Sequence, residues 1–151
     1  MLILSRRGRL VIAAVVDIAL HARPTPVSAK ALATRHALPS RHLETALQAL
    51  VRHSILKGVR GPRGGYELAR ERRRITAGDI VRAALDGGGD QPDSPSRTQS
   101  RLVVDVVEPL TAEASKAFLA VLDRVTIEDL CRAAEQISAE PGGKTPPDFT
   151  I

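Results

Sequence analysis

Apolar residues recur along much of the chain at spacings of three and four, the period of an amphipathic helix. Residues 7–22 show this pattern first and predict a helix, with Asp17 and His21 on its other faces. The apolar face of this helix is formed by Leu10, Val11, Ala14, Val15, Ile18 and Ala22. Several arginines crowd its start, where the helix dipole favours an anion, so they either meet a phosphate or only add solubilising charge.

Two more helices are predicted after a proline-containing turn. Residues 29–36 form the second helix, capped by Ser28, and residues 40–54 form the third, capped by Ser40. One face of the third helix is apolar: Leu43, Ala46, Leu47, Leu50 and Val51. Its opposite face is polar: Arg41, Thr45, Gln48 and Arg52. This arrangement is typical of a helix-turn-helix whose polar face reads base edges, although an ordinary amphipathic helix shows the same pattern.

A glycine-rich turn between two short strand-like runs follows the third helix directly. Residues 56–59 and 66–68 flank Arg60-Gly61-Pro62-Arg63-Gly64-Gly65, which predicts a β-hairpin with an exposed basic tip. Such a tip lacks bulk and presents guanidinium groups, so it can approach nucleic acid closely. Alone it could be a solvated basic turn. Placed directly after three helices, it predicts the wing of a winged helix-turn-helix.

The remaining segments are short helices and polar connections. Residues 76–85 begin with Thr-Ala-Gly-Asp, the form of a capping box, and predict a helix that packs on the winged domain. Residues 87–100 are rich in Gly, Pro, Ser and Asp without periodicity, which predicts a flexible linker. A second capping box, Thr-Ile-Glu-Asp, opens a last helix over residues 126–138, and residues 139–151 predict a disordered tail.

Residues 101–125 predict a long helix that is kinked or restarted at Pro109. Its apolar stripe consists of Leu102, Val106, Leu110, Ala114, Ala117, Phe118, Val121 and Val125. A lone helix cannot bury such a stripe, so we expect it to pair with the same helix of a second chain, with packing back on its own domain as the alternative. We therefore expect a winged domain at residues 1–86 and a helical dimerisation region at residues 101–138.

The charge is divided unevenly along the 151 residues. Residues 1–75 hold 15 Lys and Arg against 4 Asp and Glu, whereas residues 76–151 hold 7 against 13. A basic half of this kind indicates a polyanionic partner, although an arginine-rich base composition would also raise the count. Aromatic residues make up only 2% of the chain, so the core must consist of aliphatic side chains.

The candidate chemistry is sparse. The single cysteine, Cys131, excludes an internal disulfide framework and a multi-cysteine metal site. It shares a helix face with Ile127, Leu130 and Ala134, which favours a buried core thiol, with redox sensing as the alternative. The histidines show no ligand spacing, so we expect no metal. No nucleophile–base pair, carboxylate pair or phosphate-cradling loop stands out, so we expect no enzyme.

We expect a cytoplasmic protein without a membrane partner. An Arg-Arg pair before an apolar run is weakly reminiscent of an export signal, but Asp17 interrupts the run and no cleavage site follows. No stretch approaches the roughly 20 apolar residues that a membrane span needs.

Several short motifs occur along the chain, each of them once. They are Leu4-Ser5, Gly8, Val27-Ser28, Ser40, Leu43-Glu44, the wing Val59 to Tyr66, Leu68-Ala69-Arg70, Ile75 to Ile80 and Val125 to Leu130. With them the sequence resembles the Rrf2-type bacterial transcriptional regulators over roughly residues 2–138. The wing motif is the specific one. Leu10 stands where the family usually has an aromatic residue, a change in packing only.

The resemblance implies a mainly α protein with a small β-hairpin wing and a long C-terminal dimerisation helix. It implies a homodimer, which we expect to be a repressor, on an imperfect palindrome in double-stranded DNA, with the third helix in the major groove and the wing in the minor groove. Base contacts would come from Ser40, Arg41, His42, Glu44 and Thr45, to which the polar face adds Gln48. The wing tip would be Arg60, Gly61, Pro62, Arg63 and Gly64. Phosphates would meet Ser5, Arg7 and Ser28.

The sequence departs from the family in its sensor region. Many members hold an iron–sulfur cluster through three cysteines between the winged domain and the dimerisation helix, but residues 87–100 contain none, so we expect no cofactor. An unknown small-molecule or protein effector, or oxidation of Cys131, would then supply the signal. A non-specific architectural nucleic-acid-binding protein is the alternative function.

Overall fold

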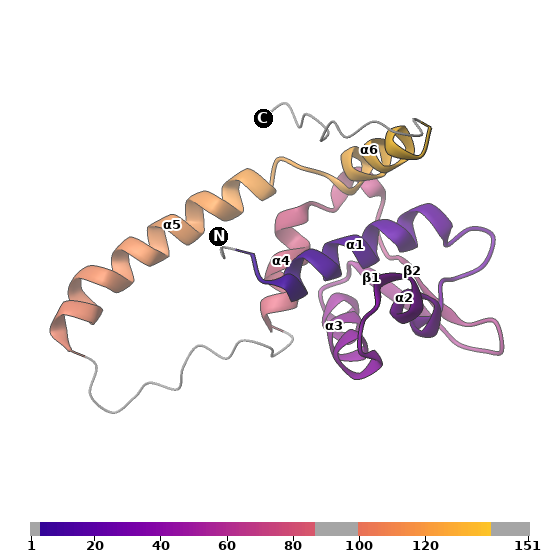
Figure 1. Ribbon diagram of the computed structural model, residues 1–151, viewed down its shortest axis with the longest axis horizontal. Helices are drawn as coiled ribbons and strands as arrows, with labels where there is room; N and C mark the ends of the chain where they lie inside the picture. The colour runs from indigo at the N-terminus through magenta and orange to yellow at the C-terminus, as the bar shows by residue number, and fades with distance from the viewer. Residues whose placement is uncertain (1–3, 87–99, 140–151) are drawn as a thin grey trace.

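The protein is mainly helical and carries one two-stranded antiparallel sheet (Figure 1), which confirms the predicted fold class. The computed structural model describes residues 4–86 and 100–139, so the predicted linker and tail fall almost wholly outside the described residues. The elements are α1 Arg6–His21, α2 Ala29–His36, α3 Ser40–Arg52, β1 Leu56–Val59, β2 Gly65–Leu68, the 3-10 turn η1 Arg72–Arg74, α4 Ala77–Asp86, the π-helical turn η2 Val103–Val107, α5 Glu108–Leu122 and α6 Ile127–Ala139.

The hydrophobic core forms around α1. Helices α2, α4 and α6 and strand β2 pack against α1, and α3 packs against α2, α4 and β1. The largest fully buried side chains are Val15, Ile18, Leu32, Leu47, Leu50, Ile55, Leu56, Ile75, Ile80, Ile127 and Cys131. Because Ile127 and Cys131 belong to this cluster, α6 is part of the same core as the winged helices, although it follows α5 in the chain. The predicted burial of Cys131 is confirmed.

Side-chain caps fix three helix starts where the sequence predicts them. The Ser28 Oγ accepts a hydrogen bond from the Ala31 N–H at 3.1 Å and so begins α2. At α4, Thr76 and Asp79 form the predicted reciprocal box, with distances of 3.0 and 3.1 Å. The equivalent box at α6 joins Thr126 and Asp129 at 3.0 and 3.2 Å. Its hydrogen bonds from Thr126 lower the pKa of Asp129.

Two expectations about single residues are wrong. Ser40 is the first residue of α3 and not its cap, because the extended Pro39 already turns the chain into the helix without a side-chain bond. Val51 is 37% exposed, and Ala49 is buried in its place, since the packed face of α3 centres on Leu47 and Leu50.

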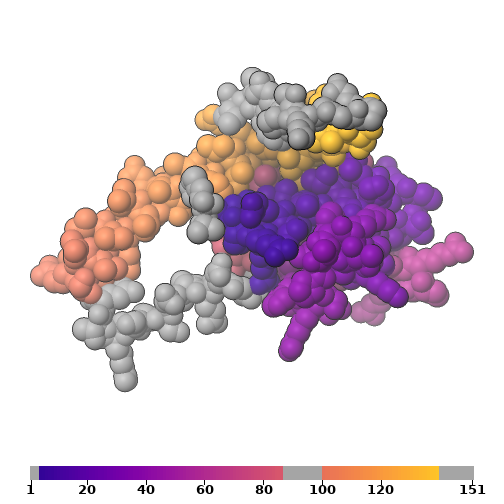
Figure 2. All heavy atoms as spheres, in the orientation of Figure 1, coloured from indigo at the N-terminus to yellow at the C-terminus, as the bar shows by residue number. Residues whose placement is uncertain are grey.

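Helix α5 projects away from the packed helices (Figures 1 and 2). Pro109 lies in its first turn, at the predicted break, but the backbone stays helical there, because the π-helical turn of residues 103–107 runs directly into α5. Along the predicted stripe, Leu102 and Leu110 are 66% and 67% exposed, whereas Phe118 is half-buried. The chain therefore leaves most of this apolar stripe uncovered. Within the described ranges, no helix is long and apolar enough to cross a membrane.

Candidate nucleic-acid interface

Helix α3 presents a row of exposed polar side chains. The residues expected at the bases are all exposed: Ser40, Arg41, His42, Glu44, Thr45 and Gln48. The opposite face holds the helix in place, because Leu47 and Leu50 are fully buried. The Thr45 hydroxyl donates to the Arg41 backbone carbonyl at 3.2 Å. Among the residues that the structure describes, Arg41 makes no ion pair, which leaves its guanidinium available to a base edge or a phosphate.

The wing is a regular antiparallel hairpin. Its register pairs Leu56 with Leu68 at the base and Val59 with Gly65 near the tip, where the Gly64 N–H donates to the Gly61 carbonyl at 2.9 Å. All of the tip residues except the half-buried Gly64 are exposed: Arg60, Gly61, Pro62 and Arg63. Lys57 does not add to the free positive charge of the tip, because it pairs with Glu67 across the sheet at 3.0 Å.

A short bridge fastens the wing to the start of the helix-turn-helix. Val27 and Tyr66 exchange two backbone hydrogen bonds of 3.0 and 2.8 Å. Only glycine fits at position 65, since a Cβ there would lie 2.4 Å from the Val27 carbonyl oxygen. Because α2 packs on α3 and α3 packs on β1, the wing and the two helices form one packed unit.

The three residues expected at phosphates lie at the starts of α1 and α2. Ser5 and Ser28 are the N-caps of these helices, and the Ser5 Oγ accepts from the Gly8 N–H at 3.1 Å. A hydroxyl that accepts such a bond keeps its own proton, with which it can donate to a phosphate. Arg7 is half-buried in the first turn of α1.

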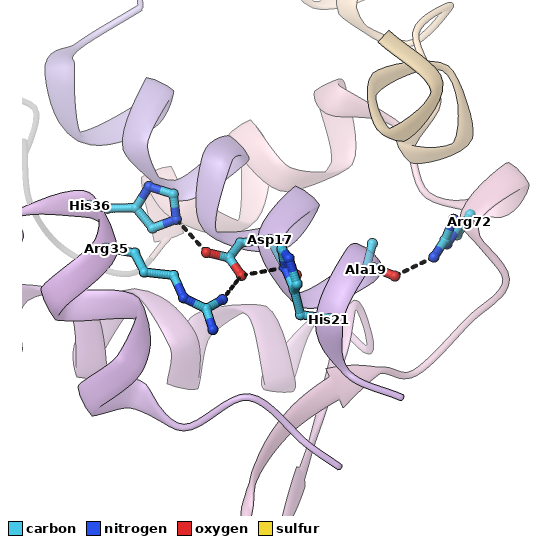
Figure 3. A network of polar contacts seen from close by, with 6 residues as sticks. All are labelled: Asp17, Ala19, His21, Arg35, His36 and Arg72. Carbon is cyan, nitrogen blue, oxygen red and sulfur yellow. Dashed lines mark hydrogen bonds and ion pairs between the residues drawn. The ribbon is translucent and has the colours of Figure 1, made fainter. Parts of the chain in front are cut away.

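Sequence reasoning missed a polar network that joins α1 to α2 (Figure 3). Asp17 is buried, and its carboxylate contacts Arg35, the His21 Nδ1 at 3.0 Å and the His36 Nε2 at 2.9 Å. A buried carboxylate is tolerated when cationic and hydrogen-bonding groups surround it. The expectation that Asp17 lies off the apolar face of α1 is therefore wrong; it follows Ala14 by three positions and adjoins the buried residues of this helix. The network fixes the end of α2, directly before the recognition helix.

A second contact in Figure 3 ties η1 to α1. The Arg72 guanidinium donates to the backbone carbonyl of Ala19, near the end of α1. This arginine is half-buried and lies close enough to Cys131 to act on its thiol electrostatically. Burial nevertheless dominates and raises the pKa of Cys131, which favours the unreactive thiol form.

Comparison with known proteins places this geometry among bacterial regulators. The family model described as Rrf2, iron-dependent transcriptional regulator, matches residues 4–133. The chain is 30% identical to the protein rrf2 of Nitratidesulfovibrio vulgaris, covering 87% of this chain and 88% of that protein. It is 34% identical to the HTH-type transcriptional regulator CymR of Bacillus subtilis, covering 84% and 88%.

Solved structures show the same fold at similar identity. The T. potens IscR structure has a TM-score of 0.66 and 32% identity, and the match covers 92% of this chain and 93% of that one. The structure of CymR, described as the global cysteine regulator of B. subtilis, has a TM-score of 0.63 and 32% identity, with 87% and 98% covered.

The residues of this chain do not fit an iron–sulfur cluster held by three thiolates. The sequence contains one cysteine, Cys131, and its side chain is 1% exposed within the core. In residues 4–86 and 100–139, no group of three or more His, Cys, Asp or Glu side chains is arranged to hold a metal ion. The iron dependence in the family description is therefore not matched by a thiolate donor set here.

The family assignment also decides the general class of function. The matched family and the relatives above are transcriptional regulators with a DNA-binding fold, which confirms the expectation that the chain is not an enzyme. The match spans the helix-turn-helix, the wing, α5 and the first part of α6. This chain belongs to the Rrf2 family of transcriptional regulators.

Proposed function

We propose that the protein is a cytoplasmic, homodimeric, sequence-specific repressor that binds an imperfect palindrome in double-stranded DNA. The observation that carries this proposal is the row of exposed polar side chains on α3, which packs beside a wing whose tip arginines are also exposed. A helix in the major groove reads base edges, whereas arginines of a wing suit the narrow, electronegative minor groove.

The division of labour follows from the chemistry of these side chains. Arg41, His42, Glu44, Thr45 and Gln48 offer donors and acceptors that distinguish base pairs. The wing tip and the helix starts at Ser5, Arg7 and Ser28 would supply contacts to phosphates and sugars, which fix the register on the duplex. We assign residues 1–86 to the winged domain, and we include α6 in its hydrophobic core.

The uncovered stripe of α5 supports the homodimer. Leu102, Val106, Leu110 and Val121 are all more than 40% exposed, and they lie along α5 and the helical turns directly before it, which the described residues leave open. A second copy of the same helix offers a stripe of the same shape and chemistry, so a two-fold contact buries both. Two recognition helices related by a two-fold axis match a palindromic site.

Genomic footprinting of bound DNA, followed by titration of variants on the recovered site, tests this function. Arg41→Ala should lose discrimination between the operator and random duplex, whereas Arg63→Ala should weaken binding to both about equally. Arg132→Ala is the matched control, because it removes the same charge from α6, across α1 from α3 (Figure 1), and should leave both affinities unchanged. Equal losses on both duplexes for Arg41→Ala would refute the proposed division.

The non-specific architectural alternative makes a different prediction. A sequence-specific regulator should prefer its operator over random duplex by about a thousandfold or more in competition at fixed salt. An architectural protein would show little preference and a steep salt dependence on every duplex. The exposed Glu44 on α3 favours specific reading, because a carboxylate accepts from cytosine but repels phosphates.

We propose that the signal does not come from a thiolate-bound cluster or from Cys131. Protein purified without oxygen should contain no stoichiometric iron, and it should bind its operator equally before and after peroxide treatment. Iron at one cluster per chain, or loss of binding that Cys131→Ser prevents, would contradict this. The signal would then be a small molecule or a protein that acts on another part of the dimer.

A further inference from the structure

Among the described residues, helix α5 is joined to the winged domain through its C-terminal end. Just after α5, the chain runs beside the entry to α4: the Ala77 N–H donates to the Val125 carbonyl at 2.8 Å, and the Ile127 N–H donates to the Ile75 carbonyl at 2.9 Å. Thr76 and Thr126 pair between these two bonds. This backbone junction anchors the C-terminal end of α5, and the rest of the helix extends outward (Figure 1).

A paired arginine and aspartate lie at the base of α5. The two terminal nitrogens of Arg82, on α4, contact the two carboxylate oxygens of Asp123 at 2.7 and 2.6 Å. Asp123 directly follows the last residue of α5. Its hydrogen bonds from Arg82 lower the pKa of Asp123. A bidentate pair of this kind fixes orientation as well as distance, because both groups are planar.

The neighbouring Gly78 is shaped to this pair. A Cβ at position 78 would lie 1.9 Å from the Asp123 Oδ1, so any side chain at this position would displace the carboxylate. Glycine within a helix costs about 1 kcal/mol relative to alanine. Its presence in α4 therefore exchanges local helix stability for the close approach of Asp123.

The contacts continue from the Arg82–Asp123 pair toward the recognition helix. Arg82 lies 3.9 Å from Asp79, and Asp79 lies 4.0 Å from Arg70. The Nε of Arg70 donates to the carbonyl of Ser54 at 3.0 Å, just beyond the end of α3. Successive contacts of at most 4.0 Å thus connect the end of α3 to the base of α5.

A small rotation at this base has a large effect at the free end. Helix α5 has 15 residues. At about 1.5 Å per residue it spans roughly 22 Å, so a tilt of about 10° moves its far end by about 4 Å. In a dimer joined through α5, the same tilt changes the distance between the two recognition helices. Half-sites about 34 Å apart tolerate little error of this kind.

We propose that Arg82 and Asp123 are a positioning pair that sets the angle of α5 on the winged domain and thereby the spacing between half-sites that the dimer accepts. This inference rests on the homodimer proposed above. Neither residue touches DNA in it. They act through the direction of α5, and Gly78 provides the space in which they meet.

Distance measurements between two spin labels test the inference directly. A nitroxide attached at Lys30→Cys, on the exposed side of α2, reports the separation of the two winged domains in the full-length dimer. Double electron–electron resonance measures this distance. The unaltered pair should give one narrow distance distribution. Arg82→Ala and Gly78→Ala should each broaden it and shift it by several ångströms. Arg132→Ala, which removes an exposed ion pair within α6, should leave it unchanged.

Gly78→Ala guards against loss of folding as a trivial explanation, because the atoms nearest the added Cβ are the ends of the Asp123 and Arg82 side chains, which can move aside. A second readout uses the operator with one or two base pairs inserted between its half-sites. The unaltered dimer should bind these lengthened operators at least tenfold more weakly than the original operator. For Arg82→Ala, the loss of affinity on insertion should be smaller.

Distance distributions that stay narrow and unshifted in dimeric Arg82→Ala and Gly78→Ala would overturn the inference. Absence of any dipolar signal in the unaltered protein would instead show that it is not a dimer. That result would refute the homodimer itself, and this inference with it.

Discussion

Helices α3 and α5 are both amphipathic, yet the chain treats their apolar faces in opposite ways. In α3, Leu47 and Leu50 are fully buried against other elements of the same chain. In α5, Leu110 is 67% exposed, and its neighbours on the stripe are also open. An apolar stripe therefore shows that a helix needs a partner, and only the packing shows whether that partner is internal.

The largest effect is expected from Leu47→Ala. The side chain is fully buried where α3 meets the core, so its truncation should lower the free energy of unfolding by about 2–5 kcal/mol through lost contacts and a cavity. Urea unfolding monitored by circular dichroism measures this. A loss below about 1 kcal/mol would mean that α3 is not held by the core as the structure shows.

A charge on the stripe of α5 should act on assembly and not on the fold. Leu110→Glu would place a carboxylate in an apolar contact between two copies, so we expect the dimer dissociation constant to rise at least 100-fold, about 2.7 kcal/mol. Sedimentation equilibrium measures it. Lys116→Glu, on the opposite face of α5, is the control and should leave the dimer intact. Equal behaviour of the two variants would remove the distinction between the faces.

Asp17→Asn sharpens the contrast within the winged domain. The amide keeps the shape of the carboxylate but loses its attraction for Arg35, His21 and His36, so we expect a loss of about 1–2 kcal/mol, limited because Arg35 and His21 are half-exposed. Because α2 holds the recognition helix, operator affinity should fall as well. Thermal unfolding and DNA titration check the two effects, and Asp105→Asn, in an exposed pair on the α5 side, should change neither.

The smallest expected effect is on the stability of the fold at acid pH. The pKa of Asp123 is lowered by Arg82, so the pair stabilises the folded state above the pKa of a free aspartate and loses this stabilisation as pH falls through the lowered value. Both side chains are more than a third exposed, so the effect should stay within the roughly 0–1 kcal/mol of exposed pairs. Asp123→Asn should flatten the acid limb of a stability profile below about pH 4. An unchanged limb would contradict the pairing.

Much of the fold followed from local patterns. The wing and the capping boxes at Thr76 and Thr126 lie where the sequence predicts them, because each depends on residues within a few positions of one another. The errors arise at the margins of helix faces. Val51 has the periodicity of a buried residue, but the neighbouring elements do not cover it.

Most of the residues assigned to DNA are exposed, whereas Arg7, Ser28 and Gly64 are half-buried. Their positions in the family motif indicate them. The contacts that hold the recognition helix and the wing in place could not be predicted in the same way. The Asp17 network and the Val27–Tyr66 bridge both join residues that are far apart in sequence, so spacing could not reveal them.

By itself, the sequence determined the order and type of the elements, the basic wing and the presence of an apolar stripe on α5. These follow from periodicity, turn chemistry and charge, which act over a few residues. Only the tertiary structure decided that α6 joins the winged core, that Asp17 is a buried anchor and that Arg82 meets Asp123 from 41 positions away. The physical reason is that burial and ion pairing depend on how distant helices pack, and a linear pattern does not contain that information.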